Sequence, residues 1–408
     1  RQIPSFFKNR YRDHKNIIKI VSASIIAVFF TVYTASAFSS GAKLFATLFS
    51  DSASGDENYN RVYVIGLIVA AVVILVYTFM GGFKAVCTTD LIQGLMMIVA
   101  ILTVPVLAYA ILTFDTSFSS ALAAKGVEQP AQFLNFFVNG DGTPVSAVSI
   151  ISNLAWGLGY FGMPHILVRF MAVKSNEEIK KSRKIAVVWV IISLTASCLI
   201  GLIARGYLTA QLDDATSESV FIRTIQQLFS GNGVLIFIGG IFLCGILAAI
   251  MSTADSQLLV TASAVSEDLY KGAVKKNASE KSSLLVGKIA VAVVAVIAFF
   301  IALNPKSSIM GLVSDAWAGF GSAFGPVVLL ALFWKRSTLS GAISGMATGA
   351  LTVIIWDYIP LVNGQTLYAA TNLYSLVVGF GLALIVNVIV SLLSKKPSKE
   401  IMDEFDSI

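Results

Sequence analysis

Residues 233–259 read GVLIFIGGIFLCGILAAIMSTADSQLL, an apolar run of membrane-helix length that ends in a cluster of polar side chains. About 20 apolar residues are enough to cross a hydrocarbon core of about 30 Å. The polar cluster consists of Ser252, Thr253, Asp255 and Ser256. An ionised side chain inside a membrane helix costs about 3 kcal/mol on insertion scales and is generally retained for function. The stretch therefore predicts a buried polar site within a membrane-spanning helix.

The composition of the whole chain agrees with a membrane protein. Of 408 residues, 56% are hydrophobic and 13% are charged, and the mean hydropathy is +0.81. A soluble domain carries about 25% charged residues, so this chain has too few to cover a water-exposed surface. The apolar runs predict an all-α polytopic protein with ten spans. These lie near 17–49, 62–81, 86–113, 145–172, 185–208, 233–265, 284–303, 308–334, 340–360 and 371–394.

The positive charges are unevenly distributed between the two sets of loops. Of 29 Lys and Arg residues, 23 lie in the set that includes both ends of the chain, or on the span ends that face it. Cytoplasmic loops retain positive charge, which predicts a multi-pass protein of the cell membrane with both termini in the cytoplasm. The net charge of +6 then reflects topology and indicates no nucleic-acid partner. The three widely spaced cysteines and two histidines predict neither a disulfide framework nor a Cys/His metal site.

The polar residues of the sixth span share one helical face. Ser252, Asp255 and Ser256 are related by three and four positions, and Thr253 lies beside them. The small side chain of Ala249, one turn earlier, leaves its carbonyl accessible. Hydroxyl, carboxylate and carbonyl oxygens are hard ligands that suit an alkali cation. Alternatives remain for both kinds of side chain. The hydroxyls could bond back to carbonyls or join helices, and Asp255 could pair with a distant Lys or lie near the cytoplasmic mouth.

A second carboxylate lies in the segment GGFKAVCTTDLIQG, residues 81–94. Asp90 follows the Gly81–Gly82 pair, at which we expect the preceding span to end. Asp90 could face the polar stripe of the sixth span and complete a cation site. An acidic residue near a helix N-terminus also complements the helix dipole. The spacing leaves both interpretations open.

Glycine and proline are concentrated in LAWGLGYFGMPHI, residues 154–166, inside the fourth span. Gly157, Gly159, Gly162 and Pro164 predict an interruption, or hinge, in regular helix there. Freed backbone groups are tolerated at membrane depth only where they are buried in protein or line a cavity. A discontinuous helix therefore points to a transporter binding site. Close helix packing by small residues is the alternative.

Aromatic side chains border this interruption. Trp156 and Tyr160 lie one helical turn apart and Pro164 follows a turn later, so an aromatic wall would face the cavity. In the first span, Tyr33 shares a helical stripe with Ser36 and Ser40. A single tyrosine in such a position is explained more readily by packing than by ligand contact.

Four segments together carry a resemblance to a known family. They are GGFKAVCTTDLIQ, WGLGYFGMPHILVRFMA, LAAIMSTADSQLLVTASAVSEDLYK and LVSDAWAGFGSAFGPVVL. In this order, through essentially the whole chain, they resemble the sodium/solute symporter family, and within it the sodium/proline symporters. The resemblance implies a five-plus-five inverted-repeat transporter fold with alternating access. Members of that family begin with three further helices, so we expect residues 1–408 to be a single transmembrane transporter domain that is N-terminally truncated relative to the family.

The resemblance also implies roles for particular residues. The family's main sodium site uses a carbonyl and two hydroxyls of one helix, which correspond here to Ala249, Ser252 and Thr253. An aspartate important in the family corresponds to Asp90. Some relatives bind a further sodium ion between these two helices, which here would recruit Ser252, Asp255, Ser256 and Asp90. Relatives often have serine where this chain has Asp255. Proline recognition in similar proteins involves positions that correspond to Tyr33, Trp156, Tyr160 and Pro164.

The function implied by the resemblance is sodium-coupled secondary active import of proline, with Na⁺ as the coupling ion. The surroundings would be the lipid bilayer, and no obligatory protein partner is evident. One alternative is a member of the same family for a sugar, sialic acid or vitamin. Another is a membrane sensor domain fused to a signalling kinase, although the tail SKKPSKEIMDEFDSI contains no kinase motif. We do not expect an enzyme, because no nucleophile–base pair accompanies His165 near a span.

Overall fold

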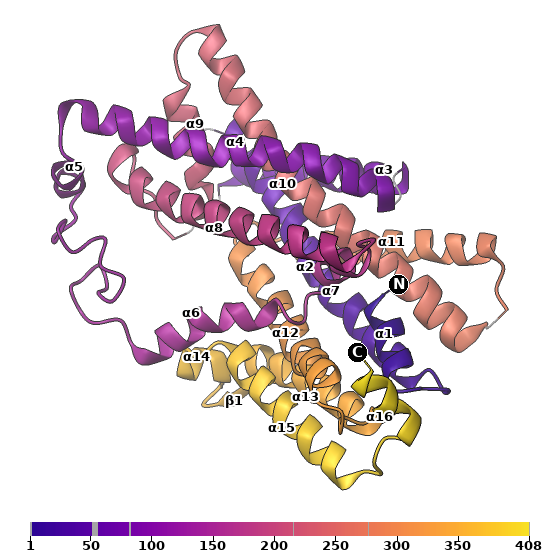
Figure 1. Ribbon diagram of the computed structural model, residues 1–408. Helices are drawn as coiled ribbons and strands as arrows, with labels where there is room; N and C mark the ends of the chain where they lie inside the picture. The colour runs from indigo at the N-terminus through magenta and orange to yellow at the C-terminus, as the bar shows by residue number, and fades with distance from the viewer. Residues whose placement is uncertain (1, 51–55, 81–82, 215, 276, 408) are drawn as a thin grey trace.

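The computed structural model describes residues 2–50, 56–80, 83–214, 216–275 and 277–407, and it is nearly all helical (Figure 1). Its long helices are α2 (Ile17–Phe49), α3 (Glu57–Met80), α4 (Phe83–Asp115), α8 (Asn176–Tyr207), α10 (Gly233–Ser263), α11 (Glu280–Ala302), α12 (Ile309–Phe333), α13 (Leu339–Tyr358) and α15 (Ser375–Leu393). The short elements are α1 (Ile3–Arg10), α5 (Phe118–Ala124), α6 (Ala147–Gly159), α7 (Pro164–Met171), η1 (Ser217–Ser219), α9 (Val220–Leu228), η2 (Ala264–Val274), β1 (Pro360–Val362), β2 (Gln365–Thr366), α14 (Leu367–Thr371) and α16 (Lys399–Asp406).

Nine helices in the described parts of the chain are long and apolar enough to cross a membrane. They account for nine of the ten predicted spans, and the prediction of an all-α membrane protein is confirmed. The remaining span, 145–172, is divided between α6 and α7. With 13 residues, α6 is about 20 Å long at 1.5 Å per residue, too short to cross alone. The Gly81–Gly82 pair lies outside the described residues.

Two helices extend beyond the predicted boundaries for local reasons. α8 begins at Asn176, although the apolar run begins only near 185. The Ser175 side chain accepts a hydrogen bond from the Glu178 backbone N–H, and acidic residues occupy the first turn. α10 continues into the π-helix η2. In η2, Asp268 is 1% exposed and its Oδ1 lies 2.7 Å from the Lys19 Nζ of α2. This ion pair holds η2 against α2.

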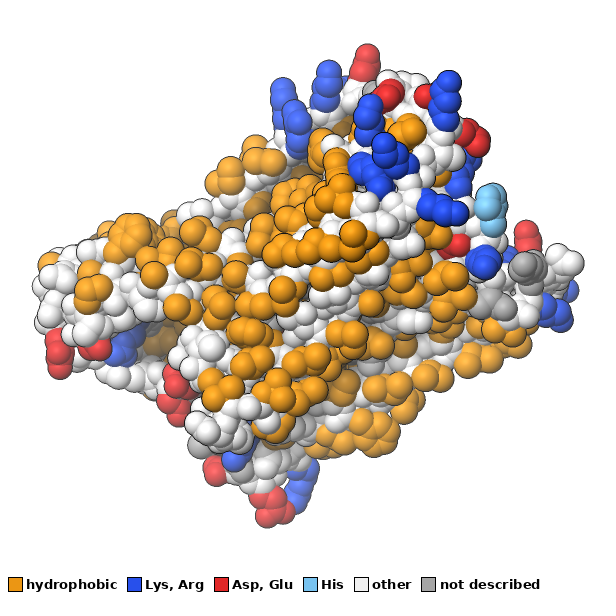
Figure 2. Space-filling model, turned by 90° about the horizontal axis from the view of Figure 1, so that it is seen from below, with side chains coloured by type: hydrophobic (Ala, Val, Ile, Leu, Met, Phe, Trp, Pro, Cys, Tyr) orange, Lys and Arg blue, Asp and Glu red, His pale blue; other side chains and the backbone are white. Residues whose placement is uncertain are grey.

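Helix α2 occupies the centre of the fold and packs against two buried clusters. One cluster combines α2 with α12, α13 and α15 and includes the fully buried Phe30, Phe320 and Phe324. The other combines α2 with α3, α10 and α11 and includes Tyr63 and Leu67. The outward surface between the charged ends is largely hydrophobic, as expected for a surface in contact with lipid (Figure 2).

The two halves of the broken helix, α6 and α7, pack against different groups of helices. α6 packs against α12 and α15, whereas α7 packs against α10 and α1 (Figure 1). Residues 160–163 between them are not in regular helix. A movement at this interruption would therefore change how α10 is placed relative to α12.

Candidate functional site

The three predicted main-site ligands of α10 converge on one carbonyl. Ser252 Oγ donates to the Ala249 carbonyl oxygen at 3.1 Å, and Thr253 Oγ1 donates to the same oxygen at 2.9 Å. All three residues are half-buried. In this conformation both hydroxyl protons are therefore used in hydrogen bonds back to the helix, as the back-bonding alternative predicts. The hydroxyl oxygens keep lone pairs, so the trio can still offer oxygen ligands to a cation.

One turn further along α10, Asp255 is buried without a cationic partner. Its side chain is fully buried, Oδ1 lies 3.5 Å from Ser256 Oγ, and Oδ2 has no hydrogen-bond partner among the described residues. Ser256 Oγ donates to the Ser252 carbonyl oxygen at 2.9 Å. Among the described residues no lysine forms an ion pair with Asp255, so the pairing with a distant lysine finds no support there. A buried, unsatisfied carboxylate oxygen is costly and indicates a ligand position.

Asp90 reaches the same region from α4. Because α4 begins at Phe83, Asp90 lies beyond the first turn, and the helix-dipole alternative is wrong. Its Oδ2 contacts the Arg169 guanidinium, whose Nη2 also donates to Ser256 Oγ at 2.7 Å. Asp90 Oδ1 is buried and has no hydrogen-bond partner among described residues. The structure therefore brings α4, α7 and α10 together through three polar side chains.

Sequence reasoning missed two residues of this region. Arg169 stands in the apolar segment HILVRFMA just after the helix interruption, and a charge in such a position is itself a functional signal. Gln257 is fully buried, and neither its Oε1 nor its Nε2 has a partner in the described structure. It lies one turn after Thr253, on the side of α10 next to the predicted stripe. Its position directly after Ser256 is the signal in the sequence that would have added it to the polar cluster.

The donor chemistry of this region fits an alkali cation. The available atoms are a carbonyl, hydroxyls and carboxylates, all hard oxygens. Asp90 Oδ1 and Asp255 Oδ2, which have no hydrogen-bond partner among the described residues, are carboxylate oxygens that could serve as ligands of a cation. In the predicted assignment, Ala249, Ser252 and Thr253 would hold one ion, and Asp90, Asp255 and Ser256 would hold a further one.

The aromatic residues of the predicted wall pack with other rings at the end of α6. The Trp156 ring stacks on Tyr374 at a centroid distance of 5.5 Å and lies 5.9 Å from the Trp317 ring. Tyr160 meets Trp317 edge-on at 4.9 Å. Trp317 Nε1 donates to the Trp156 carbonyl oxygen at 2.9 Å. α12 and the start of α15 thus fix the orientation of the wall.

Tyr33 and Pro164 lie close to this wall. The ring centroid of Tyr33 of α2 is 6.2 Å from that of His165, which follows the interruption. Pro164 is buried at the first position of α7, where the missing N–H is not needed. The four predicted substrate residues therefore come from α2 and from both sides of the helix interruption.

The three glycines of the interruption have different surroundings. A Cβ on Gly159 would lie 1.9 Å from Trp317 Nε1, and a Cβ on Gly162 would lie 2.2 Å from the Phe320 carbonyl oxygen. Both are needed for the close approach of α12, as the packing alternative states. A Cβ on Gly157 would have no described atom within 4 Å. A hinge role for these glycines stays a prediction.

Comparison with known proteins defines the class of this helical assembly. The model of the sodium:solute symporter family matches residues 2–349. The chain belongs to this family, which is a family of transporters, so the prediction that it is not an enzyme is confirmed.

Particular relatives narrow the class further. The chain is similar to proteins named sodium/proline symporter from Staphylococcus aureus and from its strain Newman, each 41% identical over 414 residues. Each alignment covers 100% of this chain and 75% of the relative. A solved Na⁺-coupled sialic acid symporter, in a substrate-bound outward-open state, matches with a TM-score of 0.68 at 18% identity, over 98% of this chain and 78% of that one. This likeness shows the fold and confirms the predicted inverted-repeat transporter architecture.

Proposed function

We propose that this protein is a sodium-coupled secondary active symporter that imports proline by alternating access. The observation that carries the proposal is the pair of buried, unpartnered carboxylate oxygens, on Asp90 and Asp255, next to a broken helix with an aromatic wall. Membership of the sodium:solute symporter family supports Na⁺ as the coupling ion. The sodium/proline symporters at 41% identity support proline as the solute.

In this proposal the residues of α10 and α4 bind the cation. Ala249, Ser252 and Thr253 supply neutral oxygens for one ion, and their hydroxyl protons turn away from the shared carbonyl when it binds. Asp90, Asp255 and Ser256 form the further position. The bound ion supplies the positive charge that these buried oxygens lack, and it thereby orders α10 against α4.

The solute would bind against the aromatic wall. The faces of Trp156 and Tyr160 suit an apolar ring, Tyr33 closes the side formed by α2, and Pro164 shapes the start of α7. Residues 160–163, outside regular helix, would let α6 and α7 change their relative orientation around the bound solute. Gly157, Gly159 and Gly162 would serve as the hinge and contact points of that movement.

The membrane potential alone makes such coupling effective. Moving one positive charge inward down about 100 mV releases about 2.3 kcal/mol, enough for roughly fiftyfold accumulation of the solute. A sodium gradient adds to this value.

We also propose that residues 1–408 form one membrane domain with both ends in the cytoplasm. α2 contributes to both buried clusters, which supports a single domain. The two ends lie side by side, since Arg12 Nη2 is 2.7 Å from the Glu404 Oε2 of α16 (Figure 1). Lys and Arg side chains gather at one end of the molecule (Figure 2), as the positive-inside rule requires of a cytoplasmic face.

Uptake by the purified, full-length protein in proteoliposomes tests the proposal. Labelled proline should accumulate when an inward sodium gradient is imposed, and should fail to accumulate when potassium or choline replaces sodium. Unlabelled sugars, sialic acid and vitamins should not compete. Accumulation without sodium would reject the coupling, and competition by one of the other solutes with no proline uptake would identify the alternative family member.

A further inference from the structure

We propose that Arg169 is a tethered cation that occupies part of the sodium-binding region, and that sodium must displace it for α7 to move. This inference rests on the proposed sodium-coupled function. In this proposal Arg169 links α7, which follows the solute-contacting residues, to α10, which carries the predicted ion ligands.

The position of Arg169 joins three separate helices. Its guanidinium contacts Asp90 Oδ2 of α4, and its Nη2 donates to Ser256 Oγ of α10 at 2.7 Å. The side chain of Arg169 is 42% exposed, whereas that of Asp90 is 16% exposed. The arginine therefore extends from the accessible side of α7 toward a mostly buried carboxylate. Because its charge is held by a flexible stem, it can leave without unfolding α7.

The charges of the cluster do not balance. Asp90 and Asp255 are two carboxylates, and the basic side chain of Arg169 pairs with Asp90 and donates to Ser256, the neighbour of Asp255. The cluster carries a formal charge of −1, which one monovalent cation would neutralise. Two oxygen atoms, Asp90 Oδ1 and Asp255 Oδ2, are also buried without a hydrogen-bond partner in the described chain. Arg169 therefore satisfies one oxygen of Asp90, whereas these two carboxylate oxygens remain available as ligands.

A sodium ion that binds to Asp90 Oδ1 and Asp255 Oδ2 must compete with the guanidinium. Both are cations, so they repel each other at short range, and both use Ser256 Oγ and the Asp90 carboxylate. Arg169 lies on α7, which continues through residues 160–163 into α6 with Trp156 and Tyr160. Release of Arg169 would thus free α7 from α4 and α10, and this change would reach the solute contacts. The alternative is that Arg169 only holds Asp90 in place.

The two interpretations predict opposite effects of Arg169→Gln on sodium affinity. If Arg169 competes with sodium, its removal leaves two carboxylates for the ion, and the sodium concentration for half-maximal proline uptake should fall about fivefold or more. Sodium should also enter the proteoliposomes without proline. If Arg169 only positions Asp90, the half-maximal concentration should stay unchanged or rise. Either of those results, or the absence of proline-independent sodium entry, would overturn the inference.

Further variants keep the test informative. Arg169→Lys retains the positive charge but not the guanidinium that contacts both Asp90 and Ser256. The sodium concentration for half-maximal uptake should therefore fall less in Arg169→Lys than in Arg169→Gln, and an equal or larger fall would overturn the inference. Arg183→Gln, an exposed arginine of α8, is the matched control and should change nothing. If Arg169→Gln alone fails to insert, D90N/R169Q should need about threefold less sodium than Asp90→Asn; an equal or higher requirement would overturn the inference. A wild-type protein without sodium-dependent proline uptake would instead reject the proposed function.

Discussion

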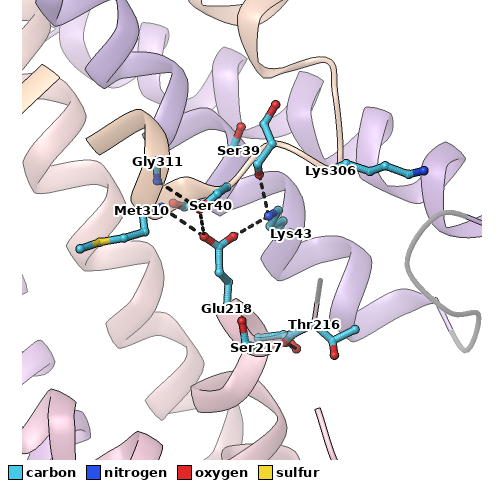
Figure 3. A network of polar contacts seen from close by, with 12 residues as sticks. Ser39, Ser40, Lys43, Thr216, Ser217, Glu218, Lys306, Met310 and Gly311 are labelled. Atoms are coloured by element: carbon cyan, nitrogen blue, oxygen red, sulfur yellow. Dashed lines mark hydrogen bonds and ion pairs between the residues drawn. The ribbon is translucent and has the colours of Figure 1, made fainter. Parts of the chain in front are cut away.

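Two clusters of acidic and basic side chains differ in how many of their carboxylate oxygens have a hydrogen-bond partner. We call the pair of Glu218 and Lys43 the outer cluster, and the group of Asp90, Arg169 and Asp255 the inner cluster. In the outer cluster, Glu218 of η1 meets Lys43 of α2 and the start of α12 (Figure 3). Its Oε2 lies 2.5 Å from Lys43 Nζ, and its Oε1 accepts from Ser308 Oγ at 2.8 Å and from the Met310 N–H at 3.1 Å. Lys43 also donates to the Ser307 carbonyl oxygen at 2.8 Å. Both carboxylate oxygens therefore have partners.

The inner cluster of Asp90, Arg169 and Asp255 leaves two carboxylate oxygens without partners in the described structure. An ion pair whose oxygens all have hydrogen-bond partners has no capacity left for a ligand, and it holds its secondary-structure elements together. An unsaturated buried carboxylate raises the energy of the protein until a ligand arrives. The difference teaches that unfilled hydrogen-bonding capacity, more than charge itself, separates a ligand site from a structural contact.

The largest effect that would test this comparison is expected from Asp255→Asn. The variant removes a buried carboxylate that has no ion-pair partner among the described residues, so the sodium concentration for half-maximal uptake should rise about tenfold or more. The free energy of unfolding should stay constant or rise, because the buried charge itself is destabilising. Uptake assays and denaturation in mixed micelles measure the two quantities. A destabilised variant with normal sodium dependence would make Asp255 a structural residue and remove the contrast between the clusters.

A smaller effect, confined to the solute, is expected from Trp156→Ala. Loss of the ring removes the contacts with Tyr374 and Trp317, and the proline concentration for half-maximal uptake should rise about fivefold. At saturating proline, sodium dependence should change little, because Trp156 touches neither carboxylate cluster. Trp156→Phe keeps an aromatic face and is the matched control. A sodium defect with normal proline affinity would show that ion binding is not confined to the inner cluster.

The sequence predicts the parts of this arrangement that depend on local pattern. Hydropathy indicates the spans, the helical period places Ser252, Asp255 and Ser256 on one face, and the glycines with Pro164 predict the interruption of α6–α7. These local patterns do not predict how the helices are arranged; the inverted-repeat fold was expected from the family resemblance. For Asp90, the spacing alone left two interpretations open.

The remaining parts depend on residues that are distant in the sequence. Arg169 reaches Asp90 across 79 positions, and Lys43 reaches Glu218 across 175. No periodicity within one helix specifies which helix lies opposite it. The close approach of α12 to Gly159 and Gly162 is of the same kind, since the partner atoms belong to Trp317 and Phe320. Such contacts follow only when the packing of the helices is known.

The smallest effect is expected from Glu218→Gln in the outer cluster. The amide oxygen can still accept from Ser308 and Met310, whereas Lys43 loses its anionic partner. The free energy of unfolding should fall by about 1–2 kcal/mol, because the pair is largely shielded from water. Sodium dependence should be unchanged. Glu57→Gln removes an exposed pair with Arg61 and should cost less than about 0.5 kcal/mol.

The pH dependence of this stability difference provides a further check on the outer cluster. Burial by itself would raise the pKa of the Glu218 carboxyl, but hydrogen bonds from Lys43, Met310 and Ser308 outweigh burial and lower it. A lowered pKa in the folded state means that the contribution of Glu218 is present above its unfolded-state value and is lost as pH falls through the folded-state value. The wild type should therefore lose its advantage over Glu218→Gln only in acid, below about pH 4.5. Two results would contradict this view: a stability difference between wild type and Glu218→Gln that disappears near neutral pH, or a changed sodium requirement in Glu218→Gln. Either would indicate that the outer cluster also takes part in ion binding.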